Sequence, residues 1–306
     1  MSPEDPRVTV VVVSQNRRDE LLASLARHRA SVIYVDNASA DGSAVAVRER
    51  FPHVEVVRLC RNAGAYARTV GARRARTPFV AFADDDSWWA PGALAAGAAT
   101  LADHSGLGLL NARILVGPEA RTDPVSEVMA RSPLPRPPGV PGVPILGFVA
   151  CAAMVRREAF LAAGGFDPVV RFPGEEERLA IDLAAGGWAM SYVDDVVVHH
   201  HPSPVRHTPA RRVRAMTRAS VLTGVMRLPR DAAVGRFRRA LGSGPAQRSG
   251  ALDALRELPA ALRARRPAPA DVLSQLELLS VTADRPDDRP PEERVPAGAR
   301  GYGGGA

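Results

Sequence analysis

Short apolar runs alternate with amphipathic segments through the first hundred residues. The runs are rich in valine, isoleucine and phenylalanine, which is typical of strands buried on both faces, and they cover 8–13, 32–35, 54–59 and 79–83. Between them, apolar residues at helical spacing predict helices over 18–29, 44–50, 66–75 and 91–101. Strands that alternate with helices form βαβ units with right-handed crossovers. We therefore predict an α/β fold with a mostly parallel, Rossmann-like sheet flanked by helices.

The pattern changes after the first hundred residues. We predict a strand over 107–116, a proline-rich surface loop over 121–144, a β segment over 148–155, helices over 158–163 and 175–185, and strands within 191–201. From 209 to about 279 the pattern is helical, amphipathic and rich in arginine. We expect three parts: an α/β domain over 1–204, a helical basic extension over 205–282, and a disordered polar tail over 283–306.

Composition limits the classes of protein. The chain has 306 residues, of which 46% are hydrophobic and 24% charged, as in soluble globular proteins. Its two cysteines exclude a disulfide framework and a four-thiolate zinc site. The N-terminal residues lack the pattern of a secretory signal, and no apolar run approaches the roughly 18 residues of a membrane span. We expect a cytoplasmic protein, with association at the inner face of a membrane left open.

The charge is uneven along the chain. The formal net charge is +7, every basic residue other than histidine is arginine, and the arginines concentrate after position 205. No aromatic-interleaved basic patch or nucleic-acid motif accompanies them, so we expect no nucleic-acid partner. In the helix predicted after 209, arginines surround Val213, Met216, Val221, Leu222 and Met226. This apolar stripe either lies on an anionic membrane surface or packs on the α/β domain, with the arginines solvated.

Polar groups follow each of the first four predicted strands. They are Ser14-Gln15-Asn16, Asp36-Asn37, the segment 61–64 and Asp84-Asp85-Asp86. Each group alone is also ordinary turn chemistry. Because ligands bind at the carboxyl ends of strands in an open parallel sheet, four such groups in succession predict a ligand site at this edge.

The triplet Asp84–Asp86 carries the most chemical information. Three adjacent carboxylates repel one another unless a cation neutralises them. A hard divalent cation, Mn²⁺ or Mg²⁺, prefers such oxygen ligands and commonly bridges to a diphosphate. No glycine-rich phosphate loop follows the first strand, so we expect a metal to hold the phosphates. The alternative is an exposed acidic turn.

Two further segments carry candidate catalytic groups. On a helix starting near Glu175, Glu176 shares the apolar face with Leu179, Ala180 and Leu183, whereas Glu175 and Glu177 turn away. Partial desolvation there would raise the pKa of Glu176, as suits a general base. The alternative is that all three glutamates only complement the helix dipole.

The histidines 199–201 lie on a β pattern, so His199 and His201 share one face and His200 the other. No third soft ligand for zinc is near. We expect His199 or His201 to join the metal and the diphosphate, and His200 to be a packing or surface residue.

Six sequence blocks occur in an order and spacing that resembles the family 2 glycosyltransferases of the GT-A fold. They are VVVSQNRRDELLASL, IYVDNASADGS, RNAGAYARTVGARRA, PFVAFADDDSWWAPGAL, GGFDPVVRFPGEEERLAIDLAAGGW and VVVHHHPS, and together they cover roughly residues 7–204. The resemblance implies a hexosyltransferase-like enzyme. Such an enzyme transfers a sugar from a nucleotide-diphosphate donor to an acceptor hydroxyl, with inversion at the anomeric centre.

The resemblance also implies roles for single residues. On the donor side, it places Ser14 and Asn16 at the nucleotide, Asp36 at its base, Asn62, Gly64 and Arg68 along the donor, and Asp84 toward the ribose. For metal binding and catalysis, it places Asp86 on the metal, Glu176 as the catalytic base, and His199 or His201 at the metal site. The family usually has aspartate at the base position and Thr-Tyr in the first loop. Because three glutamates stand in succession, the sequence leaves open whether the base is Glu176 or the glutamate next to it.

We expect a metal-dependent enzyme of cell-envelope polysaccharide or glycolipid synthesis, acting on a carbohydrate or lipid-linked acceptor. A non-catalytic nucleotide-sugar-binding protein is the alternative. A nucleotidyltransferase could share the acidic pair, but the GGFD…GEEE…GW block argues against it.

Overall fold

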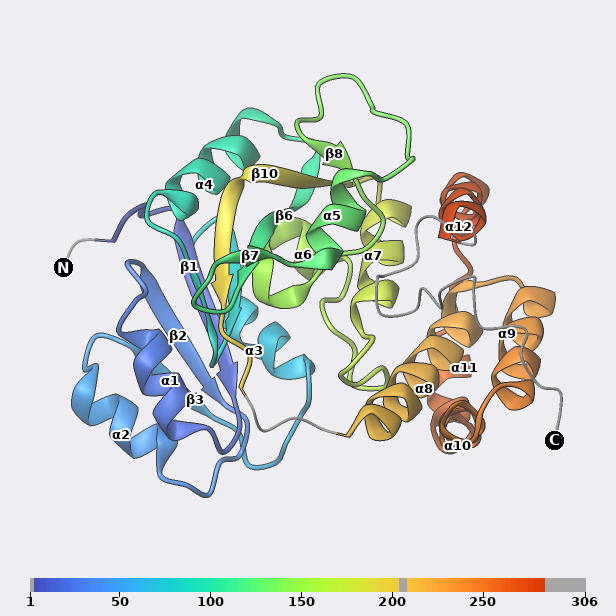
Figure 1. Cartoon of the computed structure of the whole chain (residues 1–306), viewed down its shortest axis with the longest axis horizontal. Helices are drawn as coiled ribbons and strands as arrows, with labels where there is room; N and C mark the ends of the chain where they lie inside the picture. Colours follow the sequence, from blue (N-terminus) through green and yellow to red (C-terminus); the bar gives the residue numbers. More distant parts are fainter. Residues whose placement is uncertain (1–2, 204–207, 284–306) are drawn as a thin grey trace, which may run out of the picture.

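The computed structural model describes residues 3–203 and 208–283. A ten-stranded mixed sheet forms the centre of the first part, with strand order β3-β2-β1-β4-β9-β6-β10-β5; β7 pairs with β6 and β8 with β10 (Figure 1). The pairings of β1 with β2 and β4, of β2 with β3 and of β6 with β10 are parallel, and each is longer than any antiparallel pairing. The predicted α/β fold with a mostly parallel sheet is confirmed.

The alternating elements of the first half lie where the hydrophobic pattern predicts them. They are β1 (Val8–Ser14), α1 (Arg18–Leu25), β2 (Ser31–Asp36), α2 (Ser43–Arg50), β3 (Glu55–Arg58), α3 (Tyr66–Arg74), β4 (Phe79–Asp84) and α4 (Ala93–Asp103). A short strand that the pattern did not predict, β5 (Ser87–Trp89), follows the acidic triplet.

The later elements depart from the prediction in two places. They are β6 (Leu107–Val116), β7 (Arg121–Thr122), α5 (Pro124–Ala130), β8 (Val143–Pro144), η1 (Ala150–Ala152), β9 (Ala153–Arg156), α6 (Arg157–Ala162), α7 (Glu176–Ala185) and β10 (Ala189–His200). The segment 121–144 is thus not wholly irregular, and within the β segment predicted over 148–155 the helix η1 precedes the strand β9. Asp123 caps α5 by accepting a hydrogen bond from the Val125 backbone, and Pro124 fits the first helical turn.

Helices cover both faces of the sheet. On one face, β-strand side chains such as Val10 and Tyr34 pack with α1, α2 and α4, whereas on the other Val11 and Phe82 pack with α3, α6 and α7. Alternate residues of β1 therefore enter opposite cores, which explains its unbroken run of valines. This three-layer arrangement exposes the carboxyl ends of the parallel strands at one edge.

The C-terminal region is helical, as predicted. It comprises α8 (Pro209–Arg227), α9 (Arg230–Gly242), α10 (Pro245–Ala254), η2 (Leu255–Glu257), α11 (Leu258–Arg263) and α12 (Ala270–Ala283), and it lies beside α7 (Figure 1). Helices α8, α10 and α11 share a small core of their own, whereas α12 packs on the core of the α/β domain. The expected tail falls almost entirely outside the described residues.

The apolar stripe of α8 is not available to a membrane. Val221, Leu222 and Met226 are buried in the core of the helical region, and only Met216 of the predicted stripe is well exposed. The stripe is therefore buried inside the protein, mainly against α10 and α11 and with Val170 of the α/β domain. The expectation that the arginines around it are solvated does not hold for Arg218, which is 14% exposed and binds Glu257. Within the described ranges, the helices are all too short or too polar to cross a bilayer.

Candidate active site

Hydrogen bonds connect the polar loops that follow β1 and β2. The Asn16 backbone donates to the Ser39 hydroxyl over 3.0 Å, and the Asn16 side-chain oxygen accepts from the Ala40 backbone over 2.8 Å. Asn16 has a φ of 54°, a left-handed conformation that asparagine tolerates better than most residues. Ser14 is buried at the end of β1. The two predicted donor loops thus form one connected edge.

Asp36 lies buried at the end of β2, with its carboxylate directed at its own loop. One oxygen accepts from the Ser39 backbone over 2.9 Å, and the other lies 3.4 Å from Nε of Arg58. Ser39 and Arg58, with Ala38, Leu59 and Cys60, line a hollow of about 410 Å³. Asp36, the residue predicted to read the nucleotide base, therefore contacts two of the residues that line this hollow at the carboxyl edge of the sheet.

The third loop is held to the first two by amide side chains. Asn37 accepts from the Ala63 backbone over 2.7 Å and donates to the Gly64 carbonyl over 3.2 Å. Asn62 donates to the Gln15 side chain over 2.5 Å. Asn37, which the resemblance assigns no role, organises the loop that carries the predicted donor residues.

Arg68 joins the acidic triplet to the start of α7. This arginine is buried on α3; it donates a hydrogen bond to Asp84, and its Nη1 lies 3.6 Å from Oε1 of Glu175. Burial alone would lower the pKa of Arg68, but the charges of Asp84 and Glu175 raise it overall. The guanidinium is thus a fixed cation between two predicted parts of the site.

The burial of the three glutamates differs from the prediction. Glu175 is only 1% exposed, whereas Glu176 and Glu177 are partly exposed. The helix begins at Glu176, so Glu175 precedes it and does not follow the helical periodicity that was expected to turn it outward. Glu177 instead binds Arg236 of α9 over 2.7 Å. The prediction that Glu175 faces away from the interior is therefore wrong.

Both Glu175 and Glu176 are held in an environment that favours protonation. Burial, followed by the charge of Glu176, raises the pKa of Glu175 well above its usual range. Burial also raises the pKa of Glu176, although the charge of Arg68 and a hydrogen bond from the Ala150 backbone oppose this effect. A raised pKa is what a general base near neutral pH requires.

Strand β5 folds the acidic triplet against the end of β10. The Asp84 backbone donates to the Ser87 hydroxyl over 2.8 Å, and the His201 backbone donates to the Asp86 carbonyl over 2.8 Å. The Ser203 backbone donates to the Asp86 carboxylate over 3.1 Å. Backbone hydrogen bonds therefore hold the acidic triplet in a defined loop conformation, and it is not a freely exposed turn.

The three carboxylates of this loop lie close enough to affect one another's pKa. Burial, and then the charges of Asp84 and Asp86, raise the pKa of Asp85 to about 7. Burial would raise the pKa of Asp86 too, but hydrogen bonding to His200 and the charge of that residue lower it overall. A group of carboxylate oxygens this close together suits a hard divalent cation.

The side chain of His200 contacts the acidic triplet. Its Nε2 lies 3.4 Å from Oδ1 of Asp86. His199 stacks on Trp88 at 5.4 Å between ring centroids, and His201 meets the same ring edge-on at 4.7 Å. The shared face of His199 and His201 is confirmed, but the expectation that His200 merely packs or faces solvent is wrong, because β10 pairs with β5 so that His200 lies opposite Ser87.

The Trp88 ring is in contact with one arginine and two histidines. The Arg27 guanidinium lies 4.0 Å from the ring centroid, in addition to the two histidines. Burial, followed by the charges of His201 and Arg27, lowers the pKa of His199. Trp89 is buried and donates to the Phe82 carbonyl over 3.1 Å, so it belongs to the core.

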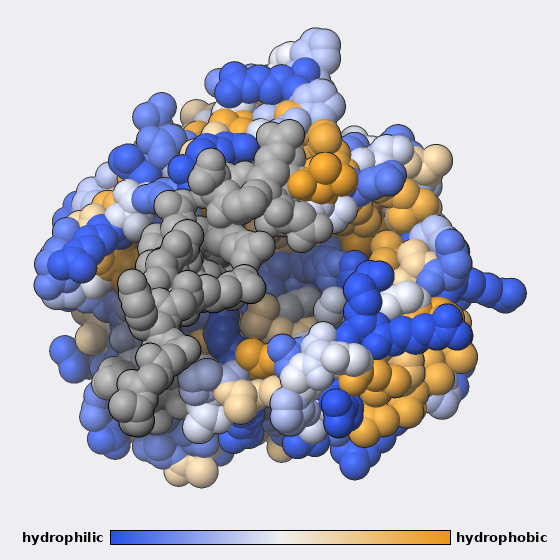
Figure 2. Space-filling view, turned by 45° about the vertical axis from the view of Figure 1, so that its right-hand side comes forward, coloured by the Kyte–Doolittle hydropathy of each residue, from blue (hydrophilic) through white to orange (hydrophobic). Residues whose placement is uncertain are grey.

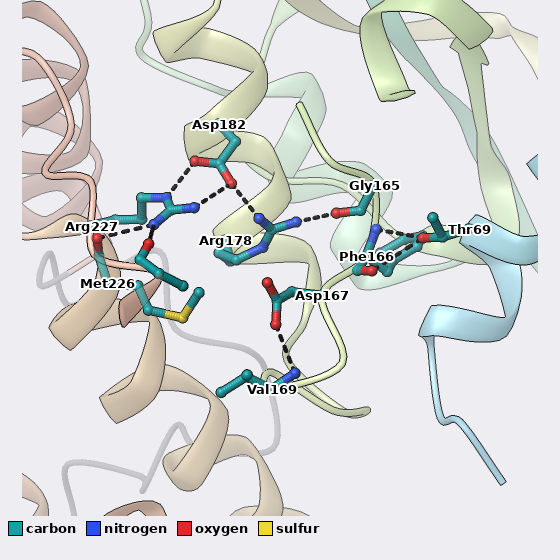
Figure 3. Close-up of polar contacts among 10 residues, drawn as sticks. Thr69, Gly165, Phe166, Asp167, Val169, Arg178, Asp182, Met226 and Arg227 are labelled. Atoms are coloured by element: carbon teal, nitrogen blue, oxygen red, sulfur yellow. Dashed lines mark hydrogen bonds and ion pairs between the residues drawn. The ribbon is translucent and has the colours of Figure 1, made fainter. Parts of the chain in front are cut away.

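A second polar network holds α7, which begins at Glu176, against its neighbours (Figure 3). The Thr69 hydroxyl of α3 donates to the Phe166 carbonyl over 3.1 Å and accepts from the Phe166 backbone over 2.8 Å. Arg178 donates to the Gly165 carbonyl of the same turn and to Asp182. Asp182 also binds Arg227 of α8, with an Nη2–Oδ2 distance of 2.9 Å. This network ties α7 to the donor side and to the helical region at once.

The sequence model of the family described as "Glycosyl transferase family 2" matches residues 9–162, about half of the chain. The chain belongs to this glycosyltransferase family. The match spans the strands, the donor loops and the acidic triplet described above, and it ends before Glu175 and β10. No curated protein matches this glycosyltransferase.

Solved structures share the fold of this glycosyltransferase. A mannosyltransferase from Pyrobaculum calidifontis, in complex with GDP-Man and Mn²⁺, aligns over 94% of this chain and 79% of its own, with 21% identity and a TM-score of 0.53. S. aureus TarS 1–349, in complex with UDP-GlcNAc, aligns over 92% and 88%, with 17% identity and a TM-score of 0.56. GalNAc-T7, with UDP, GalNAc and Mn²⁺, aligns over 90% and 57%, with 14% identity and a TM-score of 0.57. These likenesses establish the GT-A fold.

Proposed function

We propose that this glycosyltransferase moves a sugar from a nucleoside-diphosphate donor to an acceptor hydroxyl in a single, inverting displacement. The observation that supports this proposal most is the position of Arg68, whose buried guanidinium contacts Asp84 of the acidic triplet and Glu175 beside the proposed base. Donor-side and acceptor-side carboxylates are thereby held at one edge of the sheet. A non-catalytic nucleotide-sugar-binding protein would have no need of a base there.

In the proposed reaction, the Glu176 carboxylate takes the proton of the acceptor hydroxyl. The acceptor oxygen forms a bond to the anomeric carbon while the bond from that carbon to the phosphate oxygen breaks. The electron pair leaves with the nucleoside diphosphate, so no covalent enzyme intermediate is required. The raised pKa of Glu176 supports this role, because a carboxylate with a higher pKa is a stronger base.

The residues of the triplet fit a divalent cation. Asp86 would hold Mn²⁺ or Mg²⁺ through a carboxylate oxygen, with His200 adjoining it. No three histidine, cysteine, aspartate or glutamate side chains of 3–203 and 208–283 form a ready-made metal cage, so the donor diphosphate would supply further ligands. When bound, the cation neutralises charge on the leaving diphosphate. Asp84, Asn62 and the hollow beside Asp36 would hold the nucleotide and the sugar.

We further propose that the acceptor is a carbohydrate or lipid-linked molecule of the cell envelope, and that the enzyme works in the cytoplasm. The neighbouring structures contain GDP-Man and UDP-GlcNAc, which makes GDP- and UDP-sugars the first donors to examine.

The test is a donor-hydrolysis and transfer screen over UDP-, GDP- and dTDP-sugars with Mn²⁺ or Mg²⁺, followed by NMR of the product's anomeric centre. Asp86→Ala should abolish turnover, since it removes the proposed metal ligand. Full activity of this variant in excess chelator would refute metal dependence. A retained anomeric configuration would refute the single displacement.

The identity of the base is tested with two matched variants. Glu176→Gln keeps the shape of the side chain and removes the proton acceptor, so it should lower kcat by roughly 10²–10⁴-fold with little change in donor KM. Glu175→Gln should act through Arg68 and change donor KM more than kcat. The reverse pattern would make Glu175 the base.

A further inference from the structure

Exposed apolar residues form a line along the outer side of the rod made by α10, η2 and α11. Leu252, Leu255 and Leu262 are 51%, 46% and 54% exposed, and Pro259 is exposed between them. Ala251, Ala254 and Ala261, which interleave with them, are buried where α10 and α11 pack on α8, so the four exposed residues lie on the side away from α8. We name them the outer apolar stripe. Figure 2, in which the side of the molecule with the helical region comes forward, shows hydrophobic surface bordered by hydrophilic side chains on this face.

Close packing on the other side fixes the orientation of this rod. Gly250, Ala251, Ala254 and Ala261 are buried, and α10 packs on α8. A Cβ added to Gly250 would lie 2.2 Å from the Arg214 carbonyl oxygen, so the two backbones are in direct contact. The rod therefore cannot roll to bury the outer apolar stripe without breaking this contact.

The charges of the rod are sorted in the same way. Its two carboxylates, Asp253 and Glu257, bind Arg214 and Arg218 of α8, with distances of 2.5 and 2.9 Å. The Arg256 side chain also binds Asp253, over 3.1 Å, and is 81% exposed; Arg263, seven residues further along, is exposed as well. The acidic groups are thus neutralised on the inner side, and cations border the outer apolar stripe.

These features select among the surfaces that could cover the stripe. A second copy of the same face would bring its arginines against identical arginines, which like charges disfavour. A nucleic acid would use the arginines but leave the leucines without a partner. An anionic lipid surface accommodates both, because leucines enter the headgroup boundary while arginines meet lipid phosphates.

We propose that the outer apolar stripe and its flanking arginines dock this protein on an anionic membrane surface. The docking is peripheral and reversible, and it is independent of the catalytic chemistry. It places the membrane contact on α10 and α11, not on α8, whose apolar residues lie inside the protein.

The experiment is co-sedimentation of the full chain with vesicles of equal parts phosphatidylglycerol and phosphatidylcholine, and with pure phosphatidylcholine vesicles, at low and high salt. We expect sedimentation with the anionic vesicles that weakens as salt is raised. The triple variant L252Q/L255Q/L262Q should partition at least about tenfold more weakly, because it loses the apolar area that enters the bilayer. The pair R256Q/R263Q should weaken binding to anionic vesicles and reduce its salt dependence.

The matched control is V45Q/V128Q on the α/β domain. These valines are 54% and 55% exposed, close to the values of the leucines, so their replacement changes surface hydropathy equally per site but away from the stripe. This variant should bind vesicles like the unaltered protein. Circular dichroism and donor hydrolysis of every variant establish that it is folded.

Three results would overturn the proposal. The full chain could remain in the supernatant with anionic vesicles at low salt. The leucine variant could sediment as well as the control. Size-exclusion chromatography could show that the unaltered chain is a dimer that the leucine variant splits, which would make the stripe a contact between copies.

Discussion

Asp182 is the carboxylate on which two buried cations depend, and its removal should be costly. Its side chain is 13% exposed and lies between the side chains of Arg178 and Arg227, which are 4% and 7% exposed. Burial already lowers the pKa of Arg178, and the charge of Asp182 opposes that effect. Without Asp182, two guanidinium groups would remain buried and close together, with backbone carbonyls as hydrogen-bond partners and with the charge of Asp167 acting on Arg178.

The magnitude follows from this geometry. Removing one partner of a buried ion pair typically costs about 3–5 kcal/mol, since the remaining charge stays desolvated. Asp182→Ala leaves two such charges, so we expect a loss of at least about 3 kcal/mol in the free energy of unfolding. That is a large part of the roughly 5–15 kcal/mol that stabilises a typical domain. Asp182→Asn should lose most of the same amount, because it keeps the shape and removes the charge.

The assay is urea unfolding followed by circular dichroism, with Glu127→Ala as the control. Glu127 pairs with Arg131 at the same i,i+4 spacing as Arg178 with Asp182, but both side chains are more than half exposed. This pair should contribute no more than about 0.5 kcal/mol. If Asp182→Ala costs less than about 1 kcal/mol with an unchanged denaturant slope, the buried cations do not need their carboxylate and the reasoning fails.

The remaining predictions concern other parts of the chain. Burial lowers the pKa of His28 from 6.5 to about 4, so the unfolded chain binds a proton more readily and the protein should lose about 2 kcal/mol of stability between pH 7 and pH 5. His28→Gln should reduce this loss of stability between pH 7 and pH 5. An unchanged dependence of stability on pH would exclude His28 as the cause of the loss. Gly71→Ala would place a Cβ 2.4 Å from a Val11 methyl and should destabilise by about 1–3 kcal/mol in thermal unfolding, whereas Gly106→Ala meets open space. Equal melting temperatures of these two variants would contradict the packing argument.

Much of the fold follows from periodicity, and the errors lie where periodicity does not apply. The β-branched runs correctly predicted β1, β2 and β4, and the polar residues at their ends predicted the loops of the candidate site, because a parallel sheet exposes those ends at one edge. Helical spacing failed for Glu175, which precedes the helix instead of belonging to it. Alternation along β10 correctly separated His200 from its neighbours, but it could not say which face meets the triplet, since that depends on the pairing with β5.

Other features depend on contacts distant in sequence. The Arg68–Glu175 pair joins residues from α3 and the turn before α7, and neither element reveals the other by its own pattern. Helix α5 was hidden among prolines that usually indicate an irregular segment, although Asp123-Pro124 is itself a helix-start signal.

The double hydrogen bond between Thr69 and Phe166 has a consequence for the energetics of turnover. Thr69 adjoins Arg68 on α3, and Phe166 precedes the turn that leads to Glu176. One hydroxyl therefore joins the helix of the proposed donor residue Arg68 to the chain that leads to the proposed base. Their relative position is fixed by the fold itself, so under the proposed mechanism binding energy need not be spent on assembling them. The acceptor hydroxyl is then the proposed reaction partner that remains to be oriented, and we expect changes in acceptor contacts to alter kcat.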